Sequence, residues 1–166
     1  MRVLIVLYSK LLGDKDFVGR LEENIKLLKK LIGPDSLYAV ITSEMKSFID
    51  KFPDLVFIRN DKDTLFYGIY KGFRKLRGND VLVLDGKEMP TKERIMKFIS
   101  QRRKNILSVA EMGWRGIAMV KLIDLDYVIR TMERFLSEEK DFLEVMRLVK
   151  EDYGIDYEVL GGLENE

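Results

Sequence analysis

The sequence contains no cysteine and no histidine among its 166 residues. Without cysteine there are no disulfides and no thiolate zinc sites, and without histidine there is no Ser-His-Asp triad and no Cys-His pair. Any chemistry must therefore use carboxylates, lysine, arginine, tyrosine or the backbone. Many Lys, Glu and Arg residues beside this lack of cysteine are also typical of heat-adapted proteins.

Neither sign of charge dominates, since 29 Lys and Arg residues stand against 28 Asp and Glu residues, a net charge of +1. Such a balance provides no overall field to attract nucleic acid or an anionic membrane. The densest basic segment, Gln101 to Lys104, includes Arg102 and Arg103 and lies between a helical pattern and a strand pattern. We favour a solvated helix end there over a nucleic-acid site, because a helix C-terminus attracts cations.

Long hydrophobic runs are also absent from the first segment. The apolar stretch from Arg2 to Tyr8 is too short for a signal peptide with a cleavage site and far too short to span a bilayer. We therefore expect a cytoplasmic protein with no membrane partner. Hydrophobic residues make up 46% and charged residues 34%, which is typical of a globular chain, and the length predicts one domain over residues 1–166.

The hydrophobic pattern alternates between strand-like runs and helix-like stripes. The runs are β-prone and continuous, as in strands covered on both faces, and they lie at residues 3–7, 37–42, 55–58 and 81–84. The helical stripes that follow them lie at residues 17–32, 45–52 and 65–76 and after Thr91, the expected N-cap of the fourth. This alternation predicts a parallel sheet with right-handed crossovers and helices on both faces.

The pattern changes in the last third of the chain. Short strands are predicted at residues 106–110 and 116–120, and the link between them is too short for a helical crossover, so one strand runs antiparallel. Two helices follow, from about residue 125 to 136 and, with Ser137 as its expected N-cap, from about 138 to 153, before an edge strand at 157–160. We therefore expect an α/β fold: three α/β/α layers, Rossmann-like, with a mostly parallel sheet and one antiparallel strand.

Ligands of open parallel sheets bind beyond the carboxyl ends of the strands, so the residues that follow each strand are candidates for a site. Ser9 and Lys10 follow the first strand, and Asn60 lies just after the third. The segment after the fourth strand, residues 85–90, carries the most charge. A site is therefore expected where these three segments meet.

Two carboxylates, Asp85 and Glu88, flank Gly86 in the segment after the fourth strand. Together they would suit one hard cation such as Mg²⁺, which prefers oxygen ligands. A turn at Asp85-Gly86 with Glu88 as a solvated charge explains the same residues equally well. The sequence is consistent with both interpretations.

The helix predicted at residues 65–76 offers two further features. Thr64 lies with Asp61 and Asp63 where the helix begins, and capping explains at least one of the three, although a helix start also binds anions. Gly68 and Gly72 lie four residues apart, which allows a close approach, and we favour helix packing over a ligand as its purpose.

Trp114 and Arg115 lie between Gly113 and Gly116, in the predicted link between the two short strands. An indole and a guanidinium there would flank a planar or phosphorylated ligand. A tryptophan that only packs is the commoner case, and it remains the main alternative.

The order of these pieces resembles the nucleotidyltransferase superfamily of nucleotide-diphospho-sugar transferase fold, which includes sugar-phosphate nucleotidyltransferases and molybdenum-cofactor guanylyltransferases. Residues 9–17 are similar to its lysine-bearing segment, and residues 63–69 to its helix-opening turn near the base. Residues 81–90 resemble the strand and "D-M-P" loop with the metal-binding Asp, where this chain has Glu88. Residues 113–117 are similar to the strand that passes the sugar or acceptor.

The resemblance implies an enzyme that transfers a nucleotidyl or glycosyl group and binds a nucleotide or nucleotide sugar. It implies Mg²⁺ held by Asp85 and Glu88, with Lys10 neutralising phosphate charge. The remaining residues expected to contact the ligand, from this resemblance and from their positions after the strands, are Ser9, Asn60, Thr64, Gly86, Trp114 and Arg115.

Two elements of that family are missing from this sequence. Leu7-Tyr8-Ser9 leads directly into Lys10, where the family has a glycine-rich phosphate loop, and residues 161–166 hold no second metal-binding Asp. A catalytically degenerate binding or assembly module, forming a homo-oligomer through its last two helices, is therefore the alternative to an enzyme.

Overall fold

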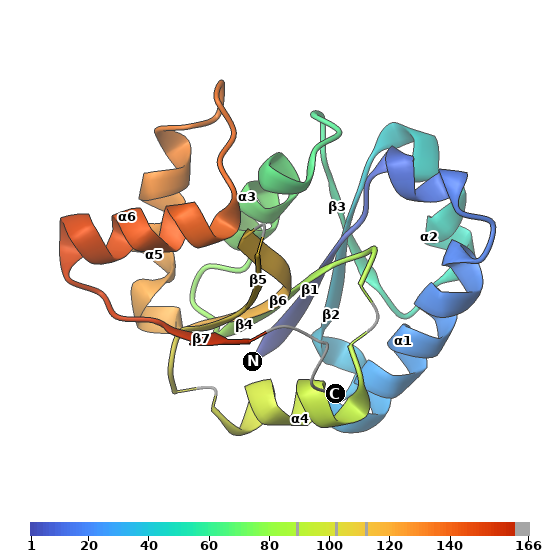
Figure 1. Ribbon diagram of the computed structural model, residues 1–166. Helices are drawn as coiled ribbons and strands as arrows, with labels where there is room; N and C mark the ends of the chain where they lie inside the picture. The colour runs from blue at the N-terminus through green and yellow to red at the C-terminus, as the bar shows by residue number, and fades with distance from the viewer. Residues whose placement is uncertain (89, 102, 112, 162–166) are drawn as a thin grey trace.

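The computed structural model describes residues 1–88, 90–101, 103–111 and 113–161, and within them a seven-stranded sheet lies between helices on both faces (Figure 1). The first part of the chain alternates between strands and helices as predicted: β1 (Arg2–Val6), α1 (Phe17–Ile32), β2 (Leu37–Ile41), α2 (Ser47–Lys51), β3 (Val56–Arg59), α3 (Leu65–Lys75), β4 (Val81–Asp85) and α4 (Lys92–Ser100). The remainder contains β5 (Ile106–Ala110), β6 (Gly113–Val120), α5 (Leu122–Glu133), α6 (Phe142–Tyr153) and β7 (Glu158–Leu160).

The strands lie in the order β3-β2-β1-β4-β6-β5-β7. Strand β6 is antiparallel to both of its neighbours, and the other pairings are parallel. The predicted mostly parallel sheet with one antiparallel strand is thereby confirmed.

The sheet separates two hydrophobic cores, because successive side chains of a strand point to opposite faces. Val3 and Ile5 of β1 face α1, α2 and α4, whereas Leu4 and Val6 face α3, α5 and α6. Residues of the neighbouring strands divide in the same way. The three-layer α/β/α arrangement follows directly from these two cores.

Helix α3 lies close against the sheet because Gly68 and Gly72 face it. A Cβ at Gly72 would lie 2.2 Å from a side-chain carbon of Leu4, and one at Gly68 would lie 2.5 Å from Val6. Only a residue without a side chain permits this approach. The two glycines therefore serve helix packing, the interpretation that the sequence favoured.

Several predicted boundaries differ from those in the structure. Strand β6 begins at Gly113 rather than residue 116, because Gly113 pairs with Ala110 in a tighter hairpin that the positive φ of 118° at Gly113 permits. Helix α5 begins at Leu122 rather than near residue 125. The N-cap of α6 is Asp141, not Ser137, since the Asp141 carboxylate accepts from the backbone N–H of Leu143.

Within the described residues, no helix combines the length and the apolar character that crossing a membrane requires.

Candidate functional site

The candidate site lies at the carboxyl edge of the sheet, where β1 and β4 end side by side. Val6 pairs with Asp85 at the last position of the parallel register, and the backbone N–H of Gly86 donates to the Val6 carbonyl at 2.8 Å. The backbone N–H of Glu88 then donates to the Asp85 carbonyl at 3.0 Å, which closes a turn. The turn foreseen at Asp85-Gly86 is therefore present, and it places a carboxylate at each end.

Asp85 is a buried carboxylate, only 2% exposed. Its Oδ1 accepts from the Tyr8 hydroxyl at 2.7 Å and from the backbone N–H of Lys87 at 3.1 Å. Burial raises the pKa of the Asp85 carboxyl, while these two hydrogen bonds and the charge of Lys87 act in the opposite direction. The Asp85 side chain is thus held in one orientation by the chain itself.

Tyr8 is the partner of Asp85, and it lies two residues after the end of β1. Burial, followed by the negative charge of Asp85 and the hydrogen bond to it, raises the pKa of the Tyr8 phenol. The phenol therefore stays protonated and donates its hydrogen bond at any physiological pH. The negative charge of Glu88 also raises the pKa of Tyr8, which indicates that the Glu88 carboxylate lies near this hydroxyl.

Glu88 is half-buried and packs over the backbone of β6. A Cβ at Gly116 would lie 2.0 Å from Cγ of Glu88, and the φ of Gly116 is +76°, a left-handed conformation that side chains disfavour. Gly116 therefore makes room for Glu88 at the edge, beside the turn that carries Asp85.

The segment that follows β1 contains a 3₁₀ helix, Ser9–Gly13. The backbone N–H of Ser9 donates to Oδ1 of Asp63 at 2.8 Å, and the Ser9 hydroxyl donates to the other oxygen of the same carboxylate. Leu11 is buried against Gly86, whereas Lys10 is exposed. Ser9 is thus bound structurally, and Lys10 is the side chain of this segment that is free to reach a ligand.

Asn60 is 3% exposed and follows β3. Its Oδ1 accepts from the backbone N–H of Lys62 at 3.2 Å, while its Nδ2 has no partner within the described residues. Nδ2 lies 3.5 Å from where a Cβ of Gly68 would be, at the first turns of α3. The buried Asn60 amide is therefore an unsatisfied donor near the carboxyl edge.

Thr64 and Trp114, two residues predicted to contact a ligand, line one pocket of about 220 Å³ with the start of α6. Thr64 caps α3, since its Oγ1 accepts from the Tyr67 N–H at 3.2 Å. The Trp114 indole N–H donates to the Ile117 carbonyl at 3.0 Å, and its ring packs edge-on against Phe142. Both side chains therefore have structural roles, and both also face a cavity.

The placement of Trp114 and Arg115 in a link is wrong, because both lie within β6. Val109 pairs with Trp114 across the hairpin, and Arg115 is exposed.

The basic segment of residues 101–104 lies at the end of α4. Gln101 is the C-cap of this helix, and Lys104 forms an ion pair with Glu158 at 3.0 Å. Arg102 lies outside the described residues. This placement agrees with the helix-end interpretation.

The acidic residues of this edge are few for a magnesium site. Among the residues that the structure describes, no group of three Asp or Glu side chains lies together in a way that could hold a metal. Asp85 and Glu88 alone are the available pair, and Mg²⁺ is commonly held by one or two carboxylates together with substrate phosphates. The chain's own residues thus fit Mg²⁺ only as part of a complex with a phosphorylated ligand.

Two residues of this edge, Tyr8 and Asp63, were not predicted as site residues. Tyr8 sits at the end of an apolar run, and its position on the same edge as Asp85 was the signal available. Asp63 was noted for helix capping, but its bond to Ser9 joins segments 54 residues apart in the sequence. Such a contact depends on the order of the strands in the sheet, and the hydrophobic periodicity of the sequence does not predict that order.

No protein family and no curated protein matches the sequence of this chain. Its fold, in contrast, is shared with solved structures. CTP:phosphocholine cytidylyltransferase of Streptococcus pneumoniae superposes with a TM-score of 0.62 at 12% identity, over 99% of this chain and 91% of that one.

Two further structures cover almost the whole chain. Molybdopterin-guanine dinucleotide biosynthesis protein A of Archaeoglobus fulgidus has a TM-score of 0.63 at 11% identity, over 97% of this chain and 83% of that one. A 4-diphosphocytidyl-2C-methyl-D-erythritol synthase has a TM-score of 0.68 at 11% identity, over 98% and 89%. The chain therefore has the fold of the nucleotide-diphospho-sugar transferases, as its sequence resemblance implied. Sequence identities as low as these are evidence for the fold alone.

Proposed function

We propose that this chain binds a nucleotide or a nucleotide sugar at the carboxyl edge of its sheet and transfers a nucleotidyl or glycosyl group. The observation that carries the proposal is the turn after β4, which sets the carboxylates of Asp85 and Glu88 beside the end of β1. Ligands of open α/β sheets bind at this edge. Solved structures of the same fold include a cytidylyltransferase.

The proposal assigns a role to each side chain at this edge. Glu88 and Asp85 would hold Mg²⁺ together with the phosphates of the ligand, and the exposed Lys10 would neutralise phosphate charge. Asn60 offers an unsatisfied amide donor, and Trp114, with Thr64, faces the neighbouring pocket. When bound, the metal would withdraw charge from the phosphates.

Calorimetric titration with nucleoside triphosphates and nucleotide sugars tests the proposal. With Mg²⁺ present we expect saturable binding, and with EDTA we expect much weaker binding at this edge, because without the metal the two carboxylates repel the phosphates instead of sharing Mg²⁺ with them. Mg²⁺ added without a nucleotide should give no heat. Absence of binding to every one of these ligands would reject the proposal.

Matched variants connect the binding to this edge. Glu88→Gln removes one charge from the site and should weaken Mg²⁺-dependent binding about tenfold, the loss expected of one charge-assisted contact. Glu44→Gln, at an exposed position just after β2, is the control and should leave the affinity unchanged. Equal losses in the two variants would contradict the assignment.

Lys10→Ala and Lys15→Ala form a second pair, since both lysines are exposed and five residues apart. Only Lys10 lies in the 3₁₀ helix that follows β1. We expect only Lys10→Ala to weaken nucleotide binding, and a loss restricted to Lys15→Ala would place the phosphates elsewhere.

A second candidate function, a catalytically degenerate assembly module, is favoured by two observations. The Tyr8 hydroxyl already occupies Oδ1 of Asp85. In addition, α5 exposes large apolar side chains, with Leu122 at 48% and Ile123 at 75% exposure. A second copy of the chain packing on this face would cover them.

Sedimentation equilibrium and a pyrophosphate-release assay distinguish the two functions. The assembly module predicts an oligomer that Ile123→Lys dissociates, while Met96→Lys, at a 44% exposed position on α4, does not. It also predicts no pyrophosphate release from any nucleoside triphosphate when a panel of sugar phosphates is supplied as acceptors of the nucleotidyl group. A monomer that releases pyrophosphate would exclude it.

A further inference from the structure

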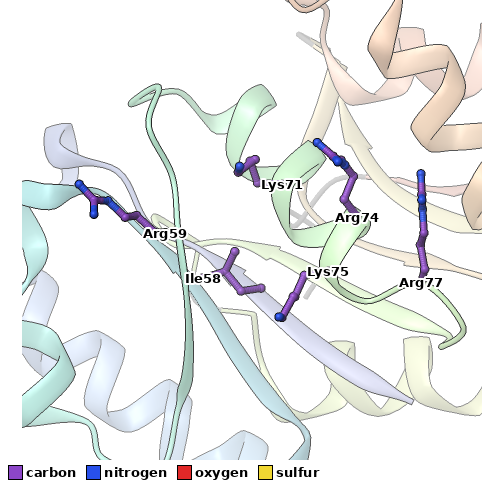
Figure 2. A pocket seen from close by; sticks show the side chains of 6 residues that line it. All are labelled: Ile58, Arg59, Lys71, Arg74, Lys75 and Arg77. Carbon is purple, nitrogen blue, oxygen red and sulfur yellow. The ribbon is translucent and has the colours of Figure 1, made fainter.

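A second surface feature, which we call the basic groove, lies between α3 and the edge strand β3. It is a pocket of about 320 Å³ lined by Ile58, Arg59, Lys71, Arg74, Lys75 and Arg77 (Figure 2). Figure 2 shows Lys71 and Lys75 extending from the helix toward Ile58 on the strand, whereas the side chain of Arg59 points away from the helix. Five of the six lining residues are therefore cations, in a chain whose net charge is only +1.

Few carboxylates neutralise these cations. Arg59 lies 3.8 Å from Asp61, and Arg77 lies 3.3 Å from Asp126, in exposed ion pairs that are worth little. In the described part of the chain, Lys71, Arg74 and Lys75 form no salt bridge. The groove therefore keeps a net positive charge after its own carboxylates are counted.

Arg74 is held in place without being neutralised. Its guanidinium lies 5.5 Å from the centre of the Tyr70 ring and donates weakly to the Tyr70 hydroxyl. That hydroxyl in turn donates to Glu133 at 2.9 Å. A cation supported in this way is ordered before any ligand arrives, which lowers the entropic cost of binding.

Fold stability explains only part of this charge. Arg74 and Lys75 occupy the last turn of α3, where the helix dipole favours cations, and Arg59 protects an edge strand against pairing. Neither effect explains Lys71 in the body of the helix. Neither explains why Lys71 and Lys75 extend over the same cavity.

We propose that the basic groove binds a chain of linked phosphoryl groups. Multiple phosphates match several unpaired cations, and arginine donors suit phosphate oxygens especially well. Ile58 is the one apolar lining residue, and no aromatic side chain lines the pocket. Single-stranded nucleic acids are bound by grooves that add aromatic platforms for the bases, so a phosphate chain fits this groove better.

Arg59 ends β3 beside Asn60, but the helix cations of the groove extend away from the carboxyl-edge site. Helix α3 begins at that edge with Thr64 and returns toward the opposite edge, where β4 starts at Val81. Lys75 and Arg77 therefore lie at the far end of the helix from Asp85. Binding in the groove should need no divalent metal, in contrast to the binding proposed for the carboxyl edge.

Inorganic tripolyphosphate in EDTA is the probe, titrated at several salt concentrations. We expect saturable binding whose affinity falls steeply and linearly with salt on logarithmic axes. Orthophosphate should bind far more weakly. ATP is then compared with tripolyphosphate. If ATP binds with the same affinity as tripolyphosphate, the ligand is a free phosphate chain. If ATP binds more tightly than tripolyphosphate, and this binding depends on Lys71, the ligand is the phosphate chain of a nucleotide.

The double variant Lys71→Gln/Lys75→Gln should weaken tripolyphosphate binding about ten- to a hundredfold, as expected for two charge-assisted contacts. Lys26→Gln/Lys30→Gln on α1 is the control, because these exposed lysines have the same spacing. The groove variant should keep Mg²⁺-dependent nucleotide binding, and Glu88→Gln should keep tripolyphosphate binding. Each proposal can thus fail without the other.

Three results would overturn the inference. The first is no tripolyphosphate binding at low salt, and the second is an equal loss of affinity in the two double variants. The third is a short single-stranded RNA that displaces tripolyphosphate at equal phosphate concentration, which would assign the groove to nucleic acid.

Discussion

The carboxyl edge and the basic groove differ in how far their charged side chains are paired within the chain. At the edge, Asp85 and Tyr8 satisfy each other, and Ser9 is bound to Asp63. In the groove, Lys71 and Lys75 have no carboxylate partner in the described part of the chain and extend over a cavity. Polar groups that are paired within the chain contribute to folding, whereas unpaired surface cations do not, so the two regions should respond differently to the same kind of substitution.

The largest loss of stability is expected from a substitution that pushes α3, the helix that carries the groove cations, away from the sheet. Gly72→Val places a branched side chain against Leu4, which is fully buried in the sheet. Overpacking of this kind should lower the free energy of unfolding by about 3 kcal/mol, measured by urea denaturation. Tripolyphosphate affinity should fall with it, because Lys71 and Lys75 would move away from β3.

Gly19→Val is the matched control, because Gly19 lies within α1 and has no neighbour within 4 Å of where its Cβ would be. Its effect on the free energy of unfolding should stay below about 0.5 kcal/mol. Similar losses in the two variants would mean that the close approach of α3 to β1 has no energetic weight.

Breaking the polar pair of the carboxyl edge should have the next largest effect. Tyr8→Phe removes the hydroxyl that donates to the buried Asp85 carboxylate, and the free energy of unfolding should fall by about 1–3 kcal/mol. Tyr38→Phe provides the comparison, since the half-buried Tyr38 has no side-chain hydrogen bond within the described residues. Equal free energies of unfolding for the two variants would mean that the Tyr8–Asp85 hydrogen bond does not stabilise the fold.

A smaller effect, visible in its pH dependence, is expected from Asp85→Asn. Burial raises the pKa of the Asp85 carboxyl above its ordinary value of 3.8, so its proton stabilises the fold at low pH. That contribution is fully present below the ordinary value and is lost as the pH rises through the raised value. The amide introduced by the substitution keeps an oxygen for the Tyr8 hydroxyl without this loss, so the variant should gain stability relative to the native chain as the pH rises.

Urea denaturation at a series of pH values from about 3 upward, below and above the ordinary carboxyl pKa, measures this difference. A stability difference that does not change with pH would show that the Asp85 carboxyl ionises in the folded protein as it does in the unfolded chain.

The smallest effect on stability is expected in the groove. Lys71→Gln/Lys75→Gln should change the free energy of unfolding by less than about 0.5 kcal/mol, because neither lysine has a charged partner to lose within the described residues. At low salt a slight gain is expected, since repulsion among the remaining cations falls. A large loss of stability would show that these lysines serve the fold, and it would remove the contrast between the two regions.

The sequence predicted those parts of the molecule that depend on local pattern. Continuous apolar runs identified the buried strands, and the spacing of Gly68 and Gly72 indicated a helix packed closely on the sheet. The short link after β5 predicted one antiparallel strand. Each of these features is determined by residues near one another along the chain, which is why periodicity and turn residues reveal them.

The remaining features depend on contacts between distant segments. The Tyr8–Asp85 hydrogen bond joins residues 77 positions apart, and it exists because β1 and β4 are neighbours in register. The groove forms only when the crossover brings Ile58 of β3 beside the cations of α3. Ser137 was a reasonable cap by residue type, but Asp141 also accepts from the Trp114 N–H, a contact that the local sequence does not contain.

The reversed direction of β6 has a consequence for how this fold can change. Because β6 runs against its neighbours, it brings its beginning, not its end, to the edge that holds Glu88. The tip of the hairpin between Ala110 and Gly113 can lengthen by insertion without rerouting any strand, whereas a longer crossover must still return to the same place. Gly113 at this tip lies against Asp141 at the start of α6, so sequence inserted there would extend from the same edge as Glu88 without disturbing the pairing of the sheet.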